Sequence, residues 1–300
     1  MQKAAVSPRV SVICPFLNAE SFIAESLASV LAQDFTDFEL ILVDDGSTDS
    51  SASIAKAHAA CLPGRATMLS HPGRANLGIS ASRSLGLSVA RGQYVAFLDA
   101  DDVWLPGKLG EQVALLDAHP DAAMACGVVT YWSSWDGGED EVIRTGGAIA
   151  PVAPPGVPVP RLYPVGDDGA PSPSEVLLRR DAVMAVGGPE DAFRDMYEDQ
   201  VLFTKLMLAY PTCFSDRHWL LYRVRGDSCT AHVRAARQYL PRRRQYFEWL
   251  AGHLVRHPAL ATPGLARTVR TELRWLRHPL LWKLRWRVRH WRARGRTTRA

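Results

Sequence analysis

The first 130 residues alternate between short apolar stretches and segments with helical periodicity. The apolar stretches are rich in β-branched residues, which indicates strands at 9–16, 38–45, 67–70, 94–99 and 124–129. Helical segments lie between them, among them 79–90 and a segment after Pro106. Strands that alternate with helices pair in parallel and are covered by those helices. We therefore expect an α/β fold with a Rossmann-like, mostly parallel sheet flanked by helices.

Polar residues cluster just past the ends of three predicted strands. Pro15 and Asn18 lie around the end of the first strand, Asp44 and Asp45 end the second, and an acidic run at 99–102 begins at the end of the fourth. In open parallel sheets, ligands bind at the carboxyl ends of the strands. The three clusters are therefore predicted to meet in one crevice.

Downstream of the fifth predicted strand the pattern changes. Residues 135–173 are crowded with Gly and Pro and lack periodicity, which predicts a long loop or a set of short irregular strands. Helical signals resume over 174–188 and again from Glu198. No internal repeat is visible.

Composition excludes several classes of protein. A chain of 300 residues with 47% hydrophobic content buries a full core, so disorder throughout is excluded. No apolar run approaches the ~20 residues of a membrane-spanning helix, and the first residues do not have a signal-peptide pattern. The five cysteines are widely spaced, which favours reduced thiols over a disulfide framework. We expect a cytoplasmic protein that can associate peripherally with the inner face of the membrane.

The acidic run is the clearest chemical signal. Carboxylates at the end of a buried strand repel one another and resist desolvation, so they need a cation or hydrogen-bond donors. Asp99 and Asp101 form an Asp-x-Asp pair whose oxygens suit a hard divalent ion such as Mn²⁺ or Mg²⁺. The alternative is a turn whose aspartates cap the next helix, and the acidic run alone fits both.

Two longer stretches carry a family resemblance. Residues 10–51, which include LILVDDGSTDS, and residues 76–109, which include YVAFLDADDVW, resemble glycosyltransferase family 2. The resemblance extends over about residues 9–230. It implies the GT-A fold and an inverting, metal-dependent enzyme that uses Mn²⁺ or Mg²⁺. Such an enzyme moves a sugar from a nucleotide-sugar donor, with UDP expected here, to a hydroxyl acceptor in polysaccharide, glycolipid or other glycoconjugate synthesis.

The resemblance implies roles on the donor side. Pro15 and Asn18 would lie in the first nucleotide loop, while Asp45 would bind the base with support from Asp44. The segment expected to border the nucleotide and its diphosphate contains Arg74, Asn76, Gly78 and Arg83. A guanidinium such as that of Arg83 offers paired hydrogen bonds to phosphate oxygens.

The resemblance also implies a metal site. Asp101 would bind the ion that bridges the two phosphates, and Asp99 would lie near the ribose or hold metal-bound water. The chain departs from the family at Ser84, where many members have Asn. Many members also have a histidine near the position of Arg225 that could bind the metal. This chain has no histidine there, so the resemblance implies no third protein ligand. Arg223 or Arg225 would contact the diphosphate instead.

An inverting transfer needs one base on the face of the sugar opposite the leaving diphosphate. The family takes this base from a Glu-Asp pair at a helix start, which implies Asp199 as the base and Glu198 as the residue that positions it or the acceptor. The alternative from the residues alone is a pair of acids that complements the helix dipole. After Gly187 and Gly188 the family often has an aromatic residue where this chain has Pro189, which leaves the shape of the acceptor pocket open.

The C-terminal segment is chemically distinct. Residues 256–300 hold 13 Lys and Arg against one acid, whereas the remainder holds 22 basic and 30 acidic residues. We predict a GT-A domain over 9–235, with a nucleotide-sugar-binding half at 9–130 and an acceptor-binding half at 131–235. A basic extension rich in Trp and Arg follows at 236–300.

Residues 270–300 interleave arginine with tryptophan, and their periodicity does not distinguish helix from strand. An anionic membrane surface, a nucleic acid or a packing partner could each explain this composition. We favour the membrane surface because Trp prefers interfaces and Arg binds anionic lipid, and we expect no nucleic acid partner.

Two other functions compete with transfer of a sugar. One is a non-catalytic nucleotide- or carbohydrate-binding protein with the same fold, and the other is nucleic-acid binding through the basic extension. No feature of the sequence decides the oligomeric state.

Overall fold

The computed structural model describes residues 7–228, 231, 233 and 235–285. The chain forms two compact units, the first ending at Ala231 and the second beginning at His232. The first unit contains a mixed sheet with flanking helices, and the described part of the second unit is helical.

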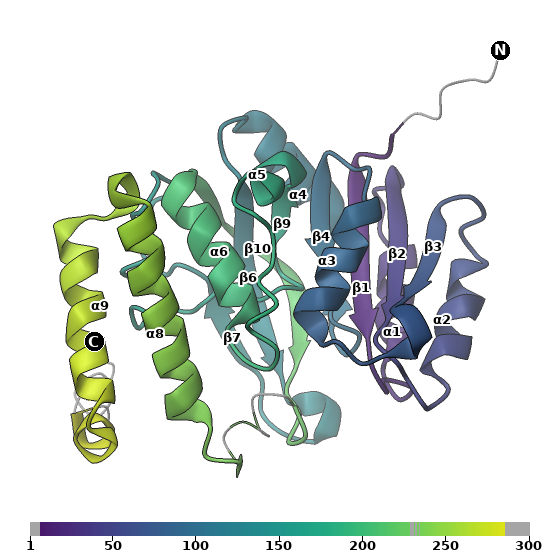
Figure 1. Ribbon diagram of the computed structural model, residues 1–300. Helices are drawn as coiled ribbons and strands as arrows, with labels where there is room; N and C mark the ends of the chain where they lie inside the picture. Colours follow the sequence, from purple (N-terminus) through teal and green to yellow (C-terminus); the bar gives the residue numbers. More distant parts are fainter. Residues whose placement is uncertain (1–6, 229–230, 232, 234, 286–300) are drawn as a thin grey trace. The chain divides into compact units, whose positions relative to one another are not determined.

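One sheet runs through the first unit, and its described residues form ten strands (Figure 1). The strands are β1 (Val10–Phe16), β2 (Phe38–Asp44), β3 (Ala66–Ser70), β4 (Tyr94–Phe97), β5 (Val103–Trp104), β6 (Met124–Trp132), β7 (Glu141–Arg144), β8 (Val152–Ala153), β9 (Leu177–Arg179) and β10 (Thr212–Arg223). Their order is β3-β2-β1-β4-β9-β6-β10-β5, with β7 paired to β6 and β8 paired to β10. The five strands predicted before residue 130 are confirmed as β1, β2, β3, β4 and β6, with small shifts at their ends.

The central strands pair in parallel, as the alternation with helices predicts. β1 lies between β2 and β4, with Val12 opposite Leu40 on one side and Ala96 on the other. All seven residues of β1 are buried, which explains why the stretch is apolar throughout rather than alternating. Because β1, β2 and β4 run in the same direction, the polar residues at their carboxyl ends lie at one edge of the sheet.

The prediction of a helix over 174–188 is wrong in its first part. Leu177–Arg179 form β9, which pairs antiparallel with both β4 and β6, and the helix begins only at Arg180. Apolar runs this short fit a buried strand as well as a helix. A strand is favoured here because the unpaired edges of β4 and β6 both receive hydrogen bonds from it.

The helices of the first unit agree with the predicted periodicity over 79–90, after Pro106 and from Glu198. They are α1 (Ile23–Leu31), α2 (Ser51–Ala59), α3 (Ile79–Val89), α4 (Lys108–Ala118), α5 (Arg180–Ala185) and α6 (Glu198–Ala209). Single turns of 3-10 helix, η1 (Pro72–Arg74) and η2 (Ser134–Asp136), lie in the loops. Residues 135–173 contain only η2, β7 and β8 as regular elements, as predicted for that loop-rich region.

Helices pack on both faces of the sheet. Leu27 of α1 and Leu109 of α4 join one apolar core with alternate residues of β1, including Val12. Ile13 points to the opposite face, where α3 packs so closely that a Cβ on Gly86 would lie 2.4 Å from Cγ2 of Ile13. Figure 1 shows α3 and α6 in front of the sheet. The sheet edge that carries the polar clusters is therefore flanked by helices of both layers.

The second unit contains two long helices side by side (Figure 1). These are α8 (Tyr239–Arg256) and α9 (Pro263–Leu276), joined through η3 (Pro258–Leu260), and a further helical stretch runs from Pro279 to the last described residue, Arg285. Within the described ranges, no helix combines the length and the apolar character needed to cross a bilayer. Residues 286–300 of the predicted membrane-binding segment lie outside the described residues.

Candidate active site

The loops after β1 and β2 are joined by side chains from the predicted donor-binding clusters. Oδ1 of Asn18 accepts a hydrogen bond from the backbone N–H of Thr48 at 2.9 Å. Oδ1 of Asp44 accepts one from the backbone N–H of Ser47 at 2.8 Å. The prediction that Pro15 lies in the first nucleotide loop is wrong, because β1 continues to Phe16 and Pro15 sits opposite Val43 of β2.

Asp45 holds the segment that follows β3. Its carboxylate is buried and accepts hydrogen bonds from the backbone N–H groups of Leu77 at 2.9 Å and Gly78 at 3.0 Å. Gly78 has a φ of 91°, a conformation that favours glycine and that points these two N–H groups toward one acceptor. Nε2 of His71 lies 3.5 Å from Oδ1 of the same carboxylate. Asp45 therefore fixes the shape of residues 71–78.

Arg74 and Asn76 lie in this fixed segment. Nη2 of Arg74 donates to the backbone carbonyl of Ser47 at 2.8 Å and lies 3.4 Å from Oδ2 of Asp44. The backbone carbonyl of Asn76 accepts a hydrogen bond from Arg194 at 3.4 Å. The structure therefore brings the predicted residues of the first two loops and of the segment after β3 together at one sheet edge.

Arg83 joins the acidic run to the start of α6. Its side chain is 3% exposed, and Nη2 donates to Oδ1 of Asp99 at 2.8 Å. Nη1 donates to Oε1 of Glu198 at 3.3 Å, and the guanidinium lies 5.4 Å from the centre of the Phe97 ring. A buried ion pair needs such geometry because desolvation of each charge is costly. The residue predicted to face the diphosphate is thus bonded to two carboxylates from opposite halves of the site.

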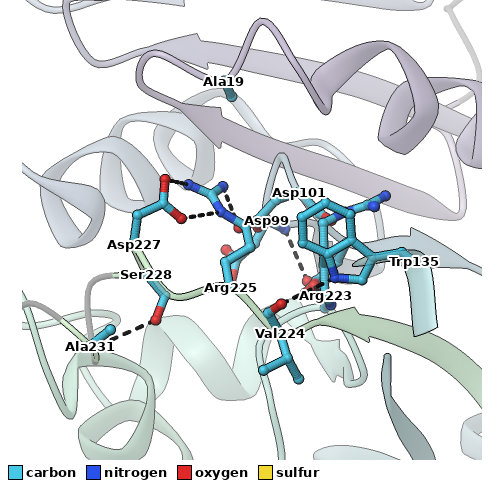
Figure 2. A network of polar contacts seen from close by, with 12 residues as sticks. Ala19, Asp99, Asp101, Trp135, Arg223, Val224, Arg225, Asp227, Ser228 and Ala231 are labelled. Atoms are coloured by element: carbon cyan, nitrogen blue, oxygen red, sulfur yellow. Dashed lines mark hydrogen bonds and ion pairs between the residues drawn. The ribbon is translucent and has the colours of Figure 1, made fainter. Parts of the chain in front are cut away.

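Arg225 pairs with the second aspartate of the motif. Figure 2 shows its guanidinium between Asp101 and Asp227, with Nη1 3.0 Å from Oδ2 of Asp101 and Nε 2.9 Å from Oδ1 of Asp227. Arg225 is a cation near the position where many members of the resembled family have a histidine. It contributes positive charge where the family pattern has a metal ligand.

Arg223 holds the loop that carries Asp101 and Asp102. Its backbone N–H donates to Oδ1 of Asp102 at 2.9 Å, and its Nε donates to the backbone carbonyl of Asp101 at 2.8 Å. Asp102 is 1% exposed and does not begin the next helix, which starts only at Lys108. Arg223 also forms an ion pair with Glu25. The end of β10 thus contacts the acidic run through both backbone and side chain.

Three aromatic rings surround the Arg223 guanidinium. The ring centres of Phe22, Trp132 and Trp135 lie 5.1, 4.4 and 5.0 Å from its Cζ. Cation–π contacts of this kind stabilise a guanidinium that has lost its water. The sequence singles out Arg223 but not these aromatics, because residues from three separate loops and strands share no spacing signal.

The acidic run fits a divalent ion in part. The side chains of Asp99 and Asp101 are 21% and 29% exposed, and each has one carboxylate oxygen outside the hydrogen bonds described above. Within residues that the structure describes, no group of three His, Cys, Asp or Glu side chains could hold a metal ion. Mg²⁺ and Mn²⁺ commonly take one or two carboxylates and complete their shells with phosphates and water. The pair fits such an ion as the protein's share of its ligands.

The carboxylates crowd one another. Burial, followed by the negative charge of Asp99, raises the pKa of Asp101, while Arg225 acts in the opposite direction. Burial and the charges of Asp101 and Asp99 raise the pKa of Asp102 well above its usual range. This cluster is therefore stabilised by added positive charge.

The acidic pair at the start of α6 lies beside the same arginine. Oδ1 and Oδ2 of Asp199 accept hydrogen bonds from the backbone N–H and the side-chain amide of Gln200, at 2.6 and 3.0 Å. Burial, followed by the negative charge of Glu198, raises the pKa of Asp199 to about 7. A small pocket beside the pair is lined by Ser80, Arg83, Phe97, Pro173, Pro189, Glu198, Asp199, Leu202 and Phe203. Its apolar walls account for the poor solvation of the carboxylates.

A family model matches the first half of this chain, and known proteins resemble part of the chain. The family model described as "Glycosyl transferase family 2" matches residues 11–146. The putative glycosyltransferase EpsE of Bacillus subtilis is 42% identical over 112 residues, which cover 37% of this chain and 40% of that protein. The uncharacterized glycosyltransferase YibD of Escherichia coli is 43% identical over 98 residues, or 33% of this chain and 27% of that protein. The chain therefore matches less than half of the length of either relative.

Solved structures share the fold over a longer range. TarS 1–349 of S. aureus in complex with UDP-GlcNAc has a TM-score of 0.60 and 23% identity, covering 74% of this chain and 61% of that chain. The mannosyltransferase PcManGT from Pyrobaculum calidifontis in complex with GDP-Man and Mn²⁺ has a TM-score of 0.58 and 20% identity, covering 91% and 70%. These likenesses confirm the predicted GT-A fold. The family model and the related sequences show that residues 11–146 of this chain are similar to glycosyl transferase family 2, as the resemblance in the sequence predicts.

Proposed function

We propose that the protein transfers a sugar from a nucleoside-diphosphate donor to a hydroxyl acceptor, with inversion at the anomeric carbon. One observation carries this proposal: Arg83 bonds both to Asp99 of the acidic run and to Glu198, the neighbour of Asp199. The group expected to meet the donor and the group expected to meet the acceptor are thus linked by one buried side chain. A protein that only binds nucleotides has no need for this link.

On the donor side, Asp45 and Asn18 shape the loops that would receive the nucleotide. Asp45 does so through the N–H groups of Leu77 and Gly78, and Asn18 through Thr48. UDP is the first candidate nucleotide, since TarS is known in complex with UDP-GlcNAc, while the complex of PcManGT with GDP-Man makes GDP the second. Direct contact of Asp45 with the base stays a prediction.

The residues that would hold a divalent ion are Asp99 and Asp101. When bound there, Mn²⁺ or Mg²⁺ stabilises the negative charge that develops on the leaving diphosphate. The Arg225 guanidinium, 3.0 Å from Asp101, brings a second positive charge to the same place. It would bind phosphate oxygens once the donor arrives, because a guanidinium offers several donors in one plane.

On the acceptor side, Asp199 would act as the general base. The acceptor oxygen forms a bond to the anomeric carbon, the diphosphate leaves with the electron pair of the broken bond, and the hydroxyl proton moves to Asp199. A base whose pKa is about 7 is well matched to this task near neutral pH. Glu198, held by Arg83, would position the acceptor or the base.

The acceptor proposed here is a hydroxyl group of a polysaccharide, glycolipid or other glycoconjugate. The pocket beside Asp199 is bounded by Pro173 and Pro189, both from the acceptor-binding half predicted at 131–235. Proline at position 189 gives this wall a fixed backbone in place of the aromatic residue that the family often has. A non-catalytic binding protein remains the alternative that the test below must separate.

Calorimetric titration with a panel of nucleoside diphosphates, with and without Mn²⁺, tests the donor site. We expect one nucleotide to bind in a Mn²⁺-dependent way, with binding lost in Asp101→Ala and kept in Asp199→Asn. Transfer assays with the matching sugar nucleotide should show loss of turnover of about 10²-fold or more in Asp199→Asn. Asp216→Asn, at a side chain that is 75% exposed, is the matched control.

Three results would count against the proposal. Absence of binding across the whole panel would reject the donor site, and turnover that is indifferent to Asp199→Asn would reject the base. Nucleotide binding without any transfer or donor hydrolysis in the wild type would favour the non-catalytic alternative.

A further inference from the structure

In the second unit, one side of the helical stretch from Pro279 to Arg285 is bonded to α9. Trp282 is 7% exposed, and its Nε1 donates to Oε1 of Glu272 at 2.7 Å. Nη1 of Arg285 donates to Oε2 of the same carboxylate at 3.1 Å. The stretch is therefore held in a defined orientation against α9.

Its opposite side exposes three leucines. Leu280 is 82% exposed, Leu281 51% and Leu284 61%. With about 100° of rotation per residue, these three side chains fall within an arc of about 100° and Trp282 points away from it. Single exposed leucines are common on protein surfaces, but three on one helical face form a patch that calls for an apolar partner. We name Leu280, Leu281 and Leu284 the leucine face.

Exposed cations flank the leucine face in sequence, and the one nearby acid is paired with arginines. Arg277 and Lys283, which precede and interrupt the three leucines in sequence, are both exposed.

Glu272 is the one acid of residues 256–300. Its two oxygens form ion pairs with Arg243 at 2.9 Å and Arg285 at 3.1 Å. Burial alone would raise the pKa of Glu272, but these arginines and the Trp282 hydrogen bond lower it, so the carboxylate stays ionised and paired.

Further arginines lie on the exterior of α9. Arg267, Arg270 and Arg274 are exposed and recur at spacings of three and four, which places them along one side of the helix. The described surface of this segment therefore combines an apolar patch with cations and lacks an exposed acid. This combination is typical of helices that lie in the interface of an anionic bilayer.

We propose that the leucine face inserts at the boundary between the headgroups and the acyl chains of an anionic lipid membrane. The leucines would bury apolar surface among the acyl chains, while Arg277 and Lys283 would pair with lipid phosphates, the long Lys283 stem reaching up to the headgroups. Nucleic acid fits less well because its phosphates offer nothing to three exposed leucines. A second copy of the chain fits less well because it would bring like charges together around the apolar contact.

Flotation of the full chain with lipid vesicles tests this proposal without reference to transferase activity. Vesicles of phosphatidylcholine with about one third phosphatidylglycerol are compared with pure phosphatidylcholine. We expect binding to the mixed vesicles that weakens with added salt. The variant Leu280→Ser/Leu281→Ser/Leu284→Ser should bind about ten-fold more weakly or worse.

Val255→Ser is the matched control, because Val255 is an 80% exposed apolar residue on α8 of the same unit. It should bind vesicles like the wild type, and unchanged circular dichroism should confirm that the triple variant is folded. Equal vesicle binding by wild type and triple variant would overturn the proposal. Absence of vesicle binding by the wild type would also overturn it, and tight DNA binding or a dimer that the leucine substitutions dissociate would then identify the partner.

Discussion

Nη2 of Arg83 lies 2.8 Å from Oδ1 of Asp99 in a part of the protein where the arginine is 3% exposed. Its other terminal nitrogen lies 3.3 Å from Glu198, so one cation pairs with two carboxylates, one from the loop after β4 and one from α6. A neutral side chain at this position would leave both acids without their partner in a poorly solvated place.

Arg83→Gln should therefore lower both activity and stability. We expect kcat to fall about 10²-fold and the free energy of unfolding to fall by about 3 kcal/mol, measured by steady-state kinetics and urea unfolding. Arg144→Gln is the control, because its ion pair with Asp216 joins side chains that are 43% and 75% exposed and should contribute under about 1 kcal/mol. Equal effects of the two substitutions would contradict the assigned role of Arg83.

Replacement of Arg225 should strengthen the binding of Mn²⁺ to the protein without nucleotide. The guanidinium competes for Oδ2 of Asp101, from which it lies 3.0 Å away, so its loss in Arg225→Gln should tighten Mn²⁺ binding about five-fold. Calorimetry with the metal alone measures this. Arg217→Gln, whose side chain is 72% exposed, should leave the affinity unchanged. Weaker metal binding in Arg225→Gln would mean that the arginine helps to shape the site rather than compete for it.

The pH dependence of transfer should report Asp199. Its pKa is raised to about 7 by burial and by Glu198, so kcat/KM should rise with pH through neutrality as the base loses its proton. Glu198→Gln removes the negative charge that raises this pKa, so the rise should move to lower pH. A rise that stays at the same pH in Glu198→Gln would argue that another group titrates.

Lys108 should make stability depend on pH in the alkaline range. Its side chain is fully buried, Nζ donates to Gln112 and lies 4.3 Å from the centre of the Trp104 ring, and burial lowers its pKa to about 7. The unfolded chain keeps the proton up to its ordinary pKa near 10.5. Between these values the unfolded state binds more protons, so the free energy of unfolding should rise with pH and decline as pH falls toward 7.

In the wild type, the free energy of unfolding is expected to rise by about 1–3 kcal/mol between pH 7 and 10. Lys108→Met should remove most of this rise. Urea unfolding at several pH values between 7 and 10 is the measurement. Lys56→Met, at an exposed helix position, should keep the slope of the wild type. Persistence of the slope in Lys108→Met would assign it to another buried group.

Much of the first unit was predictable because its signals are local. The β-branched run at β1 and the periodicity of α3 each specify an element without help from distant residues, and the polar residues at strand ends follow from parallel pairing. The segment that became β9 was not predictable in this way. Its apolar side chains suit helix and strand equally, and the open edges of β4 and β6 decide the outcome.

In the candidate site, too, some features follow from local sequence and others depend on distant contacts. Asp99, Asp101 and Asp199 stand out in the sequence because acids at element ends are conspicuous. The bond from Arg83 to Glu198 joins residues 115 positions apart, and the aromatic rings around Arg223 come from separate segments, so neither has a spacing that a sequence could display. Such pairings depend on how α3, α6 and β10 pack, which local patterns do not encode.

The position of β9 limits how this protein could be recombined with its relatives. β9 belongs to the acceptor-binding half proposed at 131–235, yet it fills the gap between β4, which lies in the other half, and β6, most of which lies there too. Leu177 sits there with Ala96 on one side and Ala125 on the other. A chimaera that exchanges acceptor specificity would insert a foreign strand into the middle of the recipient's sheet. Successful exchanges should be those whose incoming residue at this position fits between two alanines.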